Sequence, residues 1–313
     1  MHWKTRALIQ NVVSLLPDSL SYPSYYFIQR NFGRLRRLSP VERYEAGVKI
    51  WKRLLDVNYN PVGKVFFEVG TGRVPTVPLS FWLMGAERTV TVDLNPYLRP
   101  ELIREQIAYT AEHQDEIRGI FGSYLIEDRL QTLVGLSADK NLPLEKFLKT
   151  CGIEYLAPAD AAKTSLPAGS IDVHMSFTVF EHIPREILEA ILKEGSRIVR
   201  PDGVFIHYID YSDHFSHTDK SISPINFLQF PDDQWARLSG NRYMYVNRLR
   251  HDDFLKLYDD VGHKVLACEP IVNPEVSKLL QSGKVLLNAR FARKTPEVLA
   301  TTKSWVLSQS VGC

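Results

Sequence analysis

A short apolar run that leads directly into a glycine turn is the feature that most limits how this chain can fold. Residues 65–69 have the composition of a buried strand, Gly70-Thr71-Gly72 interrupts it, and residues 74–86 then read as a helix. The alternation continues, with strands expected at residues 89–93, 170–176, 203–208, 264–269 and 285–292 and helices at residues 100–121, 184–199 and 251–258. Residues 130–134 fit a strand or a loop. Strands that alternate with long helices predict an α/β fold with a doubly wound, mostly parallel sheet.

The first sixty residues have a different character. Residues 7–16 carry apolar side chains at helical spacing, Pro17 ends that run, and an aromatic, basic stretch follows. Ser39 is expected to cap a further helix that ends before residue 58. The sequence therefore predicts an N-terminal helical cap over residues 1–60, a main domain over residues 61–294 with an irregular loop at residues 209–247, and a tail at residues 295–313 that is helical or frayed.

Composition excludes several classes of protein. The formal net charge of +2 gives no global electrostatic reason to bind nucleic acid. No stretch approaches the roughly 20 apolar residues that span a bilayer, and the run after Lys4 and Arg6 lacks the cleavage site of a signal peptide. Three widely spaced cysteines (Cys151, Cys268 and Cys313) do not form a disulfide framework. We therefore expect a reducing, cytoplasmic setting.

The glycine turn and the end of the next strand form the first candidate site. Two glycines let a ligand approach the backbone closely, and Asp93 ends the following strand about twenty residues later. A carboxylate at that position can accept both hydroxyls of a ribose, which favours a nucleoside site over a plain surface aspartate. Pro75 stands where a dinucleotide fingerprint has its third glycine, so a pyrophosphate site is not supported.

Four motifs in order resemble those of the class I S-adenosylmethionine-dependent methyltransferases. They are Glu68-x-Gly70-x-Gly72, Asp160-Ala161-Ala162, the segment from Ser176 to Ile183, and the turn at residues 200–203, where Asp202 replaces the usual glycine. The resemblance implies a seven-stranded, Rossmann-like methyltransferase fold in which residues 61–294 are the catalytic domain. It also implies S-adenosylmethionine as the cofactor and methyl transfer as the reaction.

The resemblance carries over to individual residues. Glu68, Gly70, Thr71 and Gly72 would hold the methionine end and the ribose side of the cofactor, although Glu68 could instead orient the loop from within the sheet. Asp93 would bind the ribose hydroxyls, with Leu94 beside the adenine. Asp160 and Ala161 would meet the adenine edge, and Ser176 and Phe177 would line the sulfonium side.

Transfer to a hydroxyl needs a group that removes its proton, and histidines follow the later strands. His182, His214 and His217 are the candidate bases, with Asp210 beside them, whereas His207 reads as a core histidine within a strand. Asp213 accompanies them in the loop. The spacing of Asp210, His214 and His217 lacks a recognised ligand pattern, so no metal ion is assigned, although a divalent ion is an alternative.

The methyl acceptor is predicted from a resemblance that is weaker than that of the cofactor motifs. Residues 211–228 resemble a segment of bacterial methyltransferases associated with polysaccharide and glycolipid assembly, which favours O-methylation of a sugar, a glycolipid precursor or another hydroxylated small molecule. The aromatic side chains of that loop suit a sugar or a phenol. An aminopropyl transferase and a non-catalytic binding module remain the rival functions.

The N-terminal stretch has three interpretations. Its helices can close over the acceptor pocket, touch an anionic membrane surface as a peripheral contact, or form a dimer contact. Arg34, Arg36 and Arg37 could contact RNA, but the net charge argues against a nucleic-acid partner.

Overall fold

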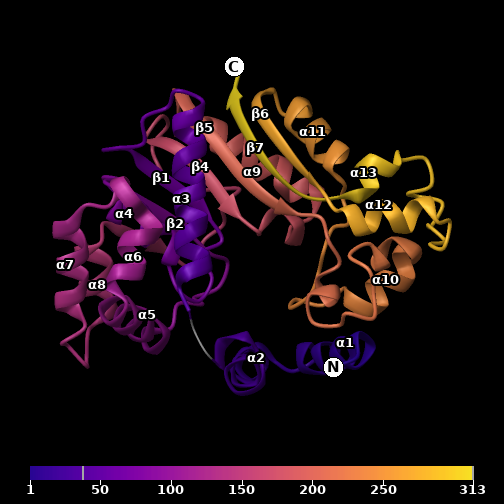
Figure 1. The fold of residues 1–313 in the computed structure, drawn as a ribbon, viewed down its shortest axis with the longest axis horizontal. Helices are drawn as coiled ribbons and strands as arrows, with labels where there is room; N and C mark the ends of the chain where they lie inside the picture. Colours follow the sequence, from indigo (N-terminus) through magenta and orange to yellow (C-terminus); the bar gives the residue numbers. More distant parts are fainter. Residues whose placement is uncertain (37–38, 312–313) are drawn as a thin grey trace. The chain divides into compact units, whose positions relative to one another are not determined.

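A seven-stranded sheet organises the chain, in the order β3-β2-β1-β4-β5-β7-β6 (Figure 1). The computed structural model describes residues 1–36 and 39–311, so Arg37 and Cys313 lie outside the described residues. The sheet is mixed and mostly parallel, which confirms the predicted fold class. The strands are β1 (Val65–Val69), β2 (Arg88–Val92), β3 (Ile153–Leu156), β4 (Ile171–Phe177), β5 (Val199–Asp210), β6 (His263–Val272) and β7 (Thr301–Ser310).

Helices precede, connect and follow these strands. They are α1 (Trp3–Ser14), α2 (Asp18–Phe32), α3 (Val41–Asp56), α4 (Thr76–Leu83), α5 (Pro100–Glu112), α6 (Gln114–Phe121), α7 (Glu127–Leu136), α8 (Leu144–Thr150), α9 (Arg185–Ile198), α10 (Asp232–Ser239), α11 (His251–Asp260), α12 (Pro274–Gln281) and α13 (Pro296–Ala300). The chain forms two compact units, each assembled from three segments.

The first unit comprises Met1–Arg36, Thr178–Glu189 and His207–Val306. In it, the N-terminal helices pack on the loop at residues 209–247. The Trp3 ring lies 5.5 Å from that of Phe215 and 6.2 Å from that of Trp235, and Asp219 accepts a 2.7 Å hydrogen bond from the Trp3 amide. In α2, Tyr25 stacks on Tyr243 at 3.9 Å. The loop therefore packs on α1 through a shared apolar cluster and on α2 through the stack of Tyr25 on Tyr243.

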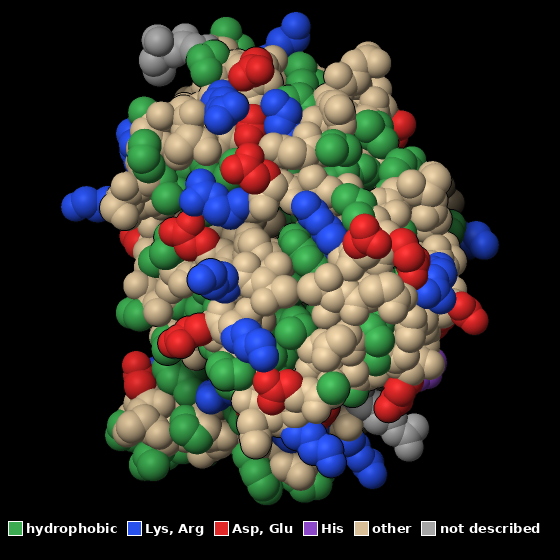
Figure 2. All heavy atoms as spheres, turned by 90° about the vertical axis from the view of Figure 1, so that its left-hand side faces the viewer, with side chains coloured by type: hydrophobic (Ala, Val, Ile, Leu, Met, Phe, Trp, Pro, Cys, Tyr) green, Lys and Arg blue, Asp and Glu red, His purple; other side chains and the backbone are tan. Residues whose placement is uncertain are grey.

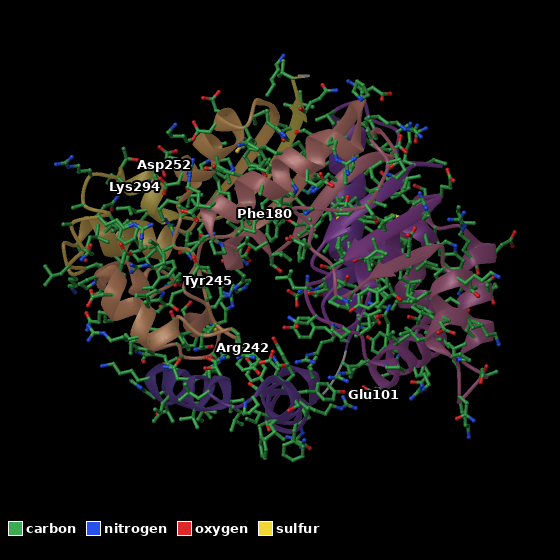
Figure 3. The ribbon with its side chains drawn as sticks, turned by 180° about the vertical axis from the view of Figure 1, so that it is seen from behind. Glu101, Phe180, Arg242, Tyr245, Asp252 and Lys294 are labelled. Atoms are coloured by element: carbon green, nitrogen blue, oxygen red, sulfur yellow. The ribbon has the colours of Figure 1, made fainter. Side chains whose placement is uncertain are left out.

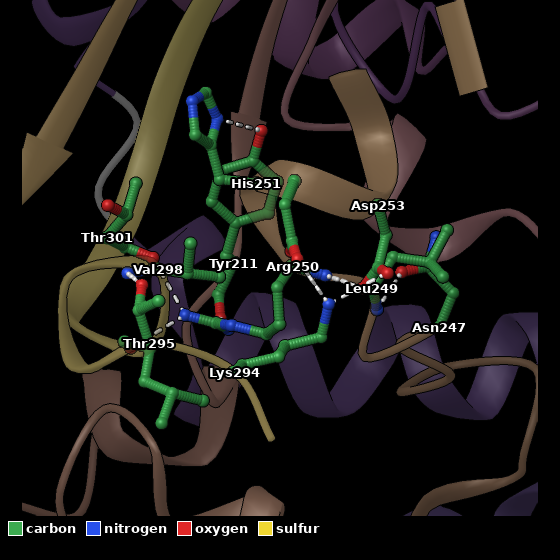
Figure 4. Close-up of polar contacts among 12 residues, drawn as sticks. Tyr211, Asn247, Leu249, Arg250, His251, Asp253, Lys294, Thr295, Val298 and Thr301 are labelled. Atoms are coloured by element: carbon green, nitrogen blue, oxygen red, sulfur yellow. Dashed lines mark hydrogen bonds and ion pairs between the residues drawn. The ribbon is translucent and has the colours of Figure 1, made fainter. Parts of the chain in front are cut away.

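A buried arginine joins three parts of this unit (Figure 4). The Arg250 guanidinium donates to the carbonyls of Tyr211, Leu299 and Thr301. It thereby links the segment after β5 to the start of β7. Beside it, Lys294 pairs with Asp253 at 2.8 Å.

The second unit comprises Arg37–Phe177, Ala190–Ile206 and Leu307–Cys313. Within it, β1 is parallel to both β2 and β4, and β2 is parallel to β3. Aromatic stacking fixes α3 and α4 to the sheet, since Trp51 of α3 stacks on Phe66 at 6.2 Å and Phe66 stacks on Phe81 of α4 at 4.3 Å. Every residue of β1 is buried, as expected for a strand paired on both sides.

Several elements differ from the sequence prediction. Residues 130–134 are helical, within α7, because Leu130 and Leu133 are buried at helical spacing behind the acidic first turn of the helix. Residues 285–292 form no strand, and of these only Phe291 is buried. The helix expected at residues 100–121 breaks at His113. Pro40, not Ser39, occupies the N-cap of α3.

The largest correction concerns the tail. Thr301–Ser310 is neither helical nor frayed: it is β7, which lies between β5 and β6 in the sheet. This strand is difficult to predict because it is rich in serine and threonine, residues that usually lie at the surface. Ser304 and Ser308 are nevertheless fully buried. Strand β3 was also missed, since it is only four residues long.

The charges and the exposed apolar side chains of the surface can be compared with the predicted partners. Figure 2 shows Lys and Arg side chains mixed with Asp and Glu over one face of the molecule, in agreement with the small net charge. The apolar side chains of Leu8 and Val12 in α1, and of Leu15 directly after it, are exposed. Among the described helices, none is both long enough and apolar enough to traverse a bilayer. Peripheral membrane contact through α1 and α2 stays a prediction.

Candidate active site

The loop after β1 has the backbone geometry of a ligand-binding turn. Gly70 and Gly72 adopt φ angles of +88° and +70°, a region that side chains disfavour. A Cβ atom added to Gly72 would meet no atom within 4 Å, so this side of the loop is open. The Gly70 amide donates to the carbonyl of Val92 at 2.9 Å, which fixes the loop to β2.

Asp93 connects the loop to the end of β2. Its Oδ2 accepts a 2.8 Å hydrogen bond from the Gly72 amide. Burial raises the pKa of this half-buried carboxyl to about 6, although the amides of Gly72, Leu94 and Asn95 oppose the shift. Leu94 beside it is 67% exposed, so its side chain has apolar surface to offer a ligand. This arrangement suits a carboxylate that accepts ribose hydroxyls.

Glu68 is buried and is linked to the loop through two hydroxyls. Thr91 donates its hydroxyl hydrogen to Glu68 at 2.5 Å, so Thr71, 2.5 Å from Thr91, must donate in turn. Burial raises the pKa of Glu68 to about 8, despite the opposing effects of Thr91 and of the Arg43 charge. These contacts support the interpretation of Glu68 as a residue that orients the loop.

A cavity of about 460 Å³ lies where β2 and β3 end. Val92, Tyr155, Leu156 and Asp160 are among its lining residues, and its volume falls in the range typical of small-molecule sites. Asp160 accepts from the Ala162 amide at 2.8 Å. Because the Ala159 amide donates to the Asp93 carbonyl at 2.9 Å, the wall of this cavity is continuous with Asp93.

Ser176 and Phe177 end β4. The Ser176 side chain is fully buried, and within residues 1–36 and 39–311 its Oγ has no hydrogen-bond partner. An unsatisfied buried hydroxyl costs about 1–3 kcal/mol, so a bound ligand is the natural source of its partner. The Arg43 guanidinium lies 5.0 Å from the centre of the Phe177 ring.

Together these residues fit S-adenosylmethionine. All ten predicted cofactor residues belong to the second unit. The open face of Gly72 matches a close approach of the ligand, and the carboxylate of Asp93 matches a ribose. The cavity beside Asp160 matches an adenine, and the unsatisfied Ser176 hydroxyl stands where the sulfonium side is expected. Their individual roles stay predictions.

The four candidate catalytic residues belong to the first unit, with Glu181 as a fifth member. The ring centroid of His214 lies 4.8 Å from that of His182 and 4.9 Å from that of His217. His217 Nε2 is 3.7 Å from Asp210 Oδ2, and His214 Nε2 is 4.0 Å from Glu181 Oε1. The structure therefore brings together the histidines that the sequence spreads over 36 positions.

Two of these side chains are held by backbone contacts. His182 Nδ1 lies 2.7 Å from the carbonyl of Tyr245, a residue labelled in Figure 3. A carbonyl only accepts, so Nδ1 donates and Nε2 carries the lone pair of the neutral ring. Desolvation also lowers the pKa of His182. Asp210 Oδ1 accepts from both the amide and the hydroxyl of Ser212, at 2.9 and 2.5 Å.

Other candidates are structural. His207 is fully buried, bonds Tyr258 at 2.5 Å and stacks on Phe180, which matches the core role expected of it. Asp213 caps a short 3-10 turn, η4 (His214–His217), by accepting from the Phe215 amide at 2.9 Å. Sequence reasoning missed Glu181, because this acid lies within a motif of the resembled family and was interpreted only as part of that motif. Its position next to His182 was the available signal.

Part of the sequence is similar to a known protein family. A family model described as a methyltransferase domain matches residues 123–207. No curated protein matches the chain. Solved structures similar in fold include a protein of Pyrococcus horikoshii (15% identity, TM-score 0.47, covering 92% of this chain and 98% of the other). An S-adenosylmethionine-dependent methyltransferase from Mesorhizobium loti shares 13% identity, with a TM-score of 0.43 and coverage of 85% and 99%.

A third solved structure, the magnesium protoporphyrin IX methyltransferase of Synechocystis, shares 11% identity, with a TM-score of 0.44 and coverage of 99% and 100%. At these identities the likeness concerns the fold alone. The family match covers β3, β4 and most of β5. The loop after β1, whose geometry suits a nucleoside, lies outside the matched range. Residues 123–207 are thus similar to a methyltransferase domain, and the protein is an enzyme that uses S-adenosylmethionine.

Proposed function

We propose that the enzyme methylates oxygen, on a sugar, a glycolipid precursor or another hydroxylated small molecule. The observation that carries this proposal is the fixed tautomer of His182, whose Nδ1 donates to the Tyr245 carbonyl while Nε2 offers a lone pair. An amine that is already neutral needs no such base, whereas a hydroxyl must lose its proton during transfer.

The proposed reaction is an in-line displacement. The cofactor supplies an activated methyl group on its sulfonium, so the protein mainly aligns the acceptor and excludes water. His182 Nε2 takes the hydroxyl proton as the oxygen–carbon bond forms and the carbon–sulfur bond breaks. His214, whose ring adjoins that of His182, would orient the acceptor oxygen together with His217 and Asp210.

The aromatic argument for a sugar fails in the structure. Phe215 and Phe227 of the loop are fully buried in the apolar cluster with Trp3, where they cannot stack on an acceptor. The proposal of a hydroxylated acceptor therefore depends on the histidine cluster, and the choice of a sugar or glycolipid precursor depends on the looser likeness of residues 211–228.

Methyl transfer from labelled S-adenosylmethionine tests the proposal. Nucleotide sugars, monosaccharides and phenols form the hydroxyl panel, with polyamines as the contrasting acceptors. We expect label on an oxygen of one hydroxylated class, a large kcat loss in His182→Gln with little change in KM, and normal turnover in His113→Gln, which changes an exposed histidine of the other unit. Label on nitrogen or carbon alone, or full activity in His182→Gln, would contradict the proposal.

A further inference from the structure

The loop after β5 carries a second chemical feature. Asp210, His214 and His217 each offer a ligand atom within 4.8 Å of the other two. Residues three apart in a 3-10 turn project on the same side, so η4 directs both imidazoles to one place. Two ligands of a single ion, with bonds of about 2.0–2.2 Å, lie roughly 3–4 Å apart, and the 3.7 Å between His217 Nε2 and Asp210 Oδ2 is in that range.

We propose that Asp210, His214 and His217 bind one divalent transition-metal ion. Two imidazoles and one carboxylate form a donor set that suits Zn²⁺, Mn²⁺, Fe²⁺ or Co²⁺, whereas Mg²⁺ and Ca²⁺ prefer oxygen ligands. The ion would leave coordination positions open, because the chain supplies three ligands and one ion takes four to six.

Neighbouring residues already hold Asp210 and the turn that carries both histidines in place. Ser212 fixes Asp210 through Oδ1, which directs Oδ2 towards His217. Asn226 donates to Asp213 at 2.9 Å and so secures the cap of η4, while Phe215 anchors the turn in the apolar cluster. Supporting contacts of this kind orient metal ligands in known sites.

One cation competes for the carboxylate. Lys303 Nζ lies 3.8 Å from Asp210 Oδ2, and its side chain is 40% exposed. A long, half-exposed lysine can turn into solvent at little cost, so it does not block the ion. It would instead neutralise part of the charge on Asp210 before the metal ion binds.

The role of the ion rests on the proposed function. A divalent ion lowers the pKa of a coordinated hydroxyl. The acceptor hydroxyl would bind at an open position of the ion, and Nε2 of His182, whose ring adjoins that of His214, would receive the proton. Glu181, 4.0 Å from His214, is placed to contact the ion or the acceptor.

Metal binding is measured directly on the full-length protein, without any acceptor. After dialysis against a chelator, the protein is titrated with Co²⁺ while its visible ligand-field absorption is recorded, and Zn²⁺ is then added in competition. We expect one Co²⁺ per chain, displaced by Zn²⁺. Asp210→Asn and His217→Gln should each weaken binding at least tenfold, whereas His113→Gln should bind as the wild type does.

Binding of S-adenosylhomocysteine serves as the folding control, because its residues lie in the other unit. Absence of saturable Co²⁺ binding in protein that still binds S-adenosylhomocysteine would overturn the proposal. So would binding that survives Asp210→Asn and His217→Gln but is lost in Glu181→Gln or His113→Gln. Metal binding without transfer to any hydroxyl would support the metal site and reject the proposed function, so the two failures are distinguishable.

Discussion

At the scale of single residues, Asp93 is the strongest test of the cofactor site. Its carboxylate is expected to accept ribose hydroxyls, and a charge-assisted hydrogen bond is worth about 1.5–3 kcal/mol. Asp93→Asn should therefore weaken S-adenosylhomocysteine binding by about 10- to 100-fold, measured by calorimetric titration. The control is Asp115→Asn, which changes a fully exposed carboxylate of α6. Equal affinity of the two variants would remove Asp93 from the site.

The same carboxyl predicts how cofactor affinity depends on pH. Burial raises the pKa of Asp93 to about 6 in the ligand-free protein, so the group is ionised above that pH and protonated below it. Since the ionised form accepts the ribose hydroxyls, affinity for S-adenosylhomocysteine should fall as the pH drops through about 6 and level off above about 7. Titrations from pH 5 to pH 8 would reveal this, and Asp93→Asn should show a flatter profile.

Ser176 gives a prediction in which stability and affinity change in opposite directions. Its buried hydroxyl lacks a partner among the described residues, so Ser176→Ala should stabilise the ligand-free protein by up to about 1–3 kcal/mol. The same change should weaken S-adenosylhomocysteine binding if the cofactor supplies that partner. Urea unfolding and calorimetry on the one variant measure both. A loss of stability together with unchanged affinity would show that the hydroxyl has a structural role.

At the scale of elements, the packing of α3 on α4 depends on one glycine. A Cβ atom at Gly47 would lie 1.7 Å from Ser80 Oγ and 2.6 Å from its Cβ, so the two helices touch here. Gly47→Ala should lower the free energy of unfolding by about 1–3 kcal/mol, as overpacking does. Adding Ser80→Gly should recover part of that loss, whereas Gly135→Ala, in α7 with open space around it, should cost nothing comparable.

Elements also show what the sequence could predict. β1 was predicted with its exact bounds and β2 and β4 to within one residue, because buried parallel strands read as continuous apolar runs. β7 was not, because its buried serines and threonines resemble surface residues. Leu130 and Leu133 have helical spacing in the sequence. A segment of five residues, however, is too short to distinguish the 3.6-residue period of a helix from the two-residue period of a strand.

The candidate site likewise contains residues that the sequence predicts and residues that only the structure brings together. The glycine turn and Asp93 were identifiable because their spacing along the chain is set by one βαβ unit. The cluster of His182, His214 and His217 could be suspected only from residue type, since the loop that brings these rings together is shaped by long-range contacts such as that between Trp3 and Phe215. The contacts of His207 with Tyr258 and of Asp213 with the Phe215 amide then separated these two residues from the candidates.

At the scale of the whole molecule, the order of the strands in the sheet constrains how the chain can fold during synthesis. Among the strands that the structure describes, β6 has no neighbour in the sheet other than β7, and β7 lies between it and β5. While the chain is being made, β5 and β6 emerge before residues 301–310, so the edge of the sheet stays incomplete until those residues leave the ribosome. Nascent chains therefore expose an open strand edge, where chaperones or aggregation partners can bind, and the fold is completed only after its last strand is released.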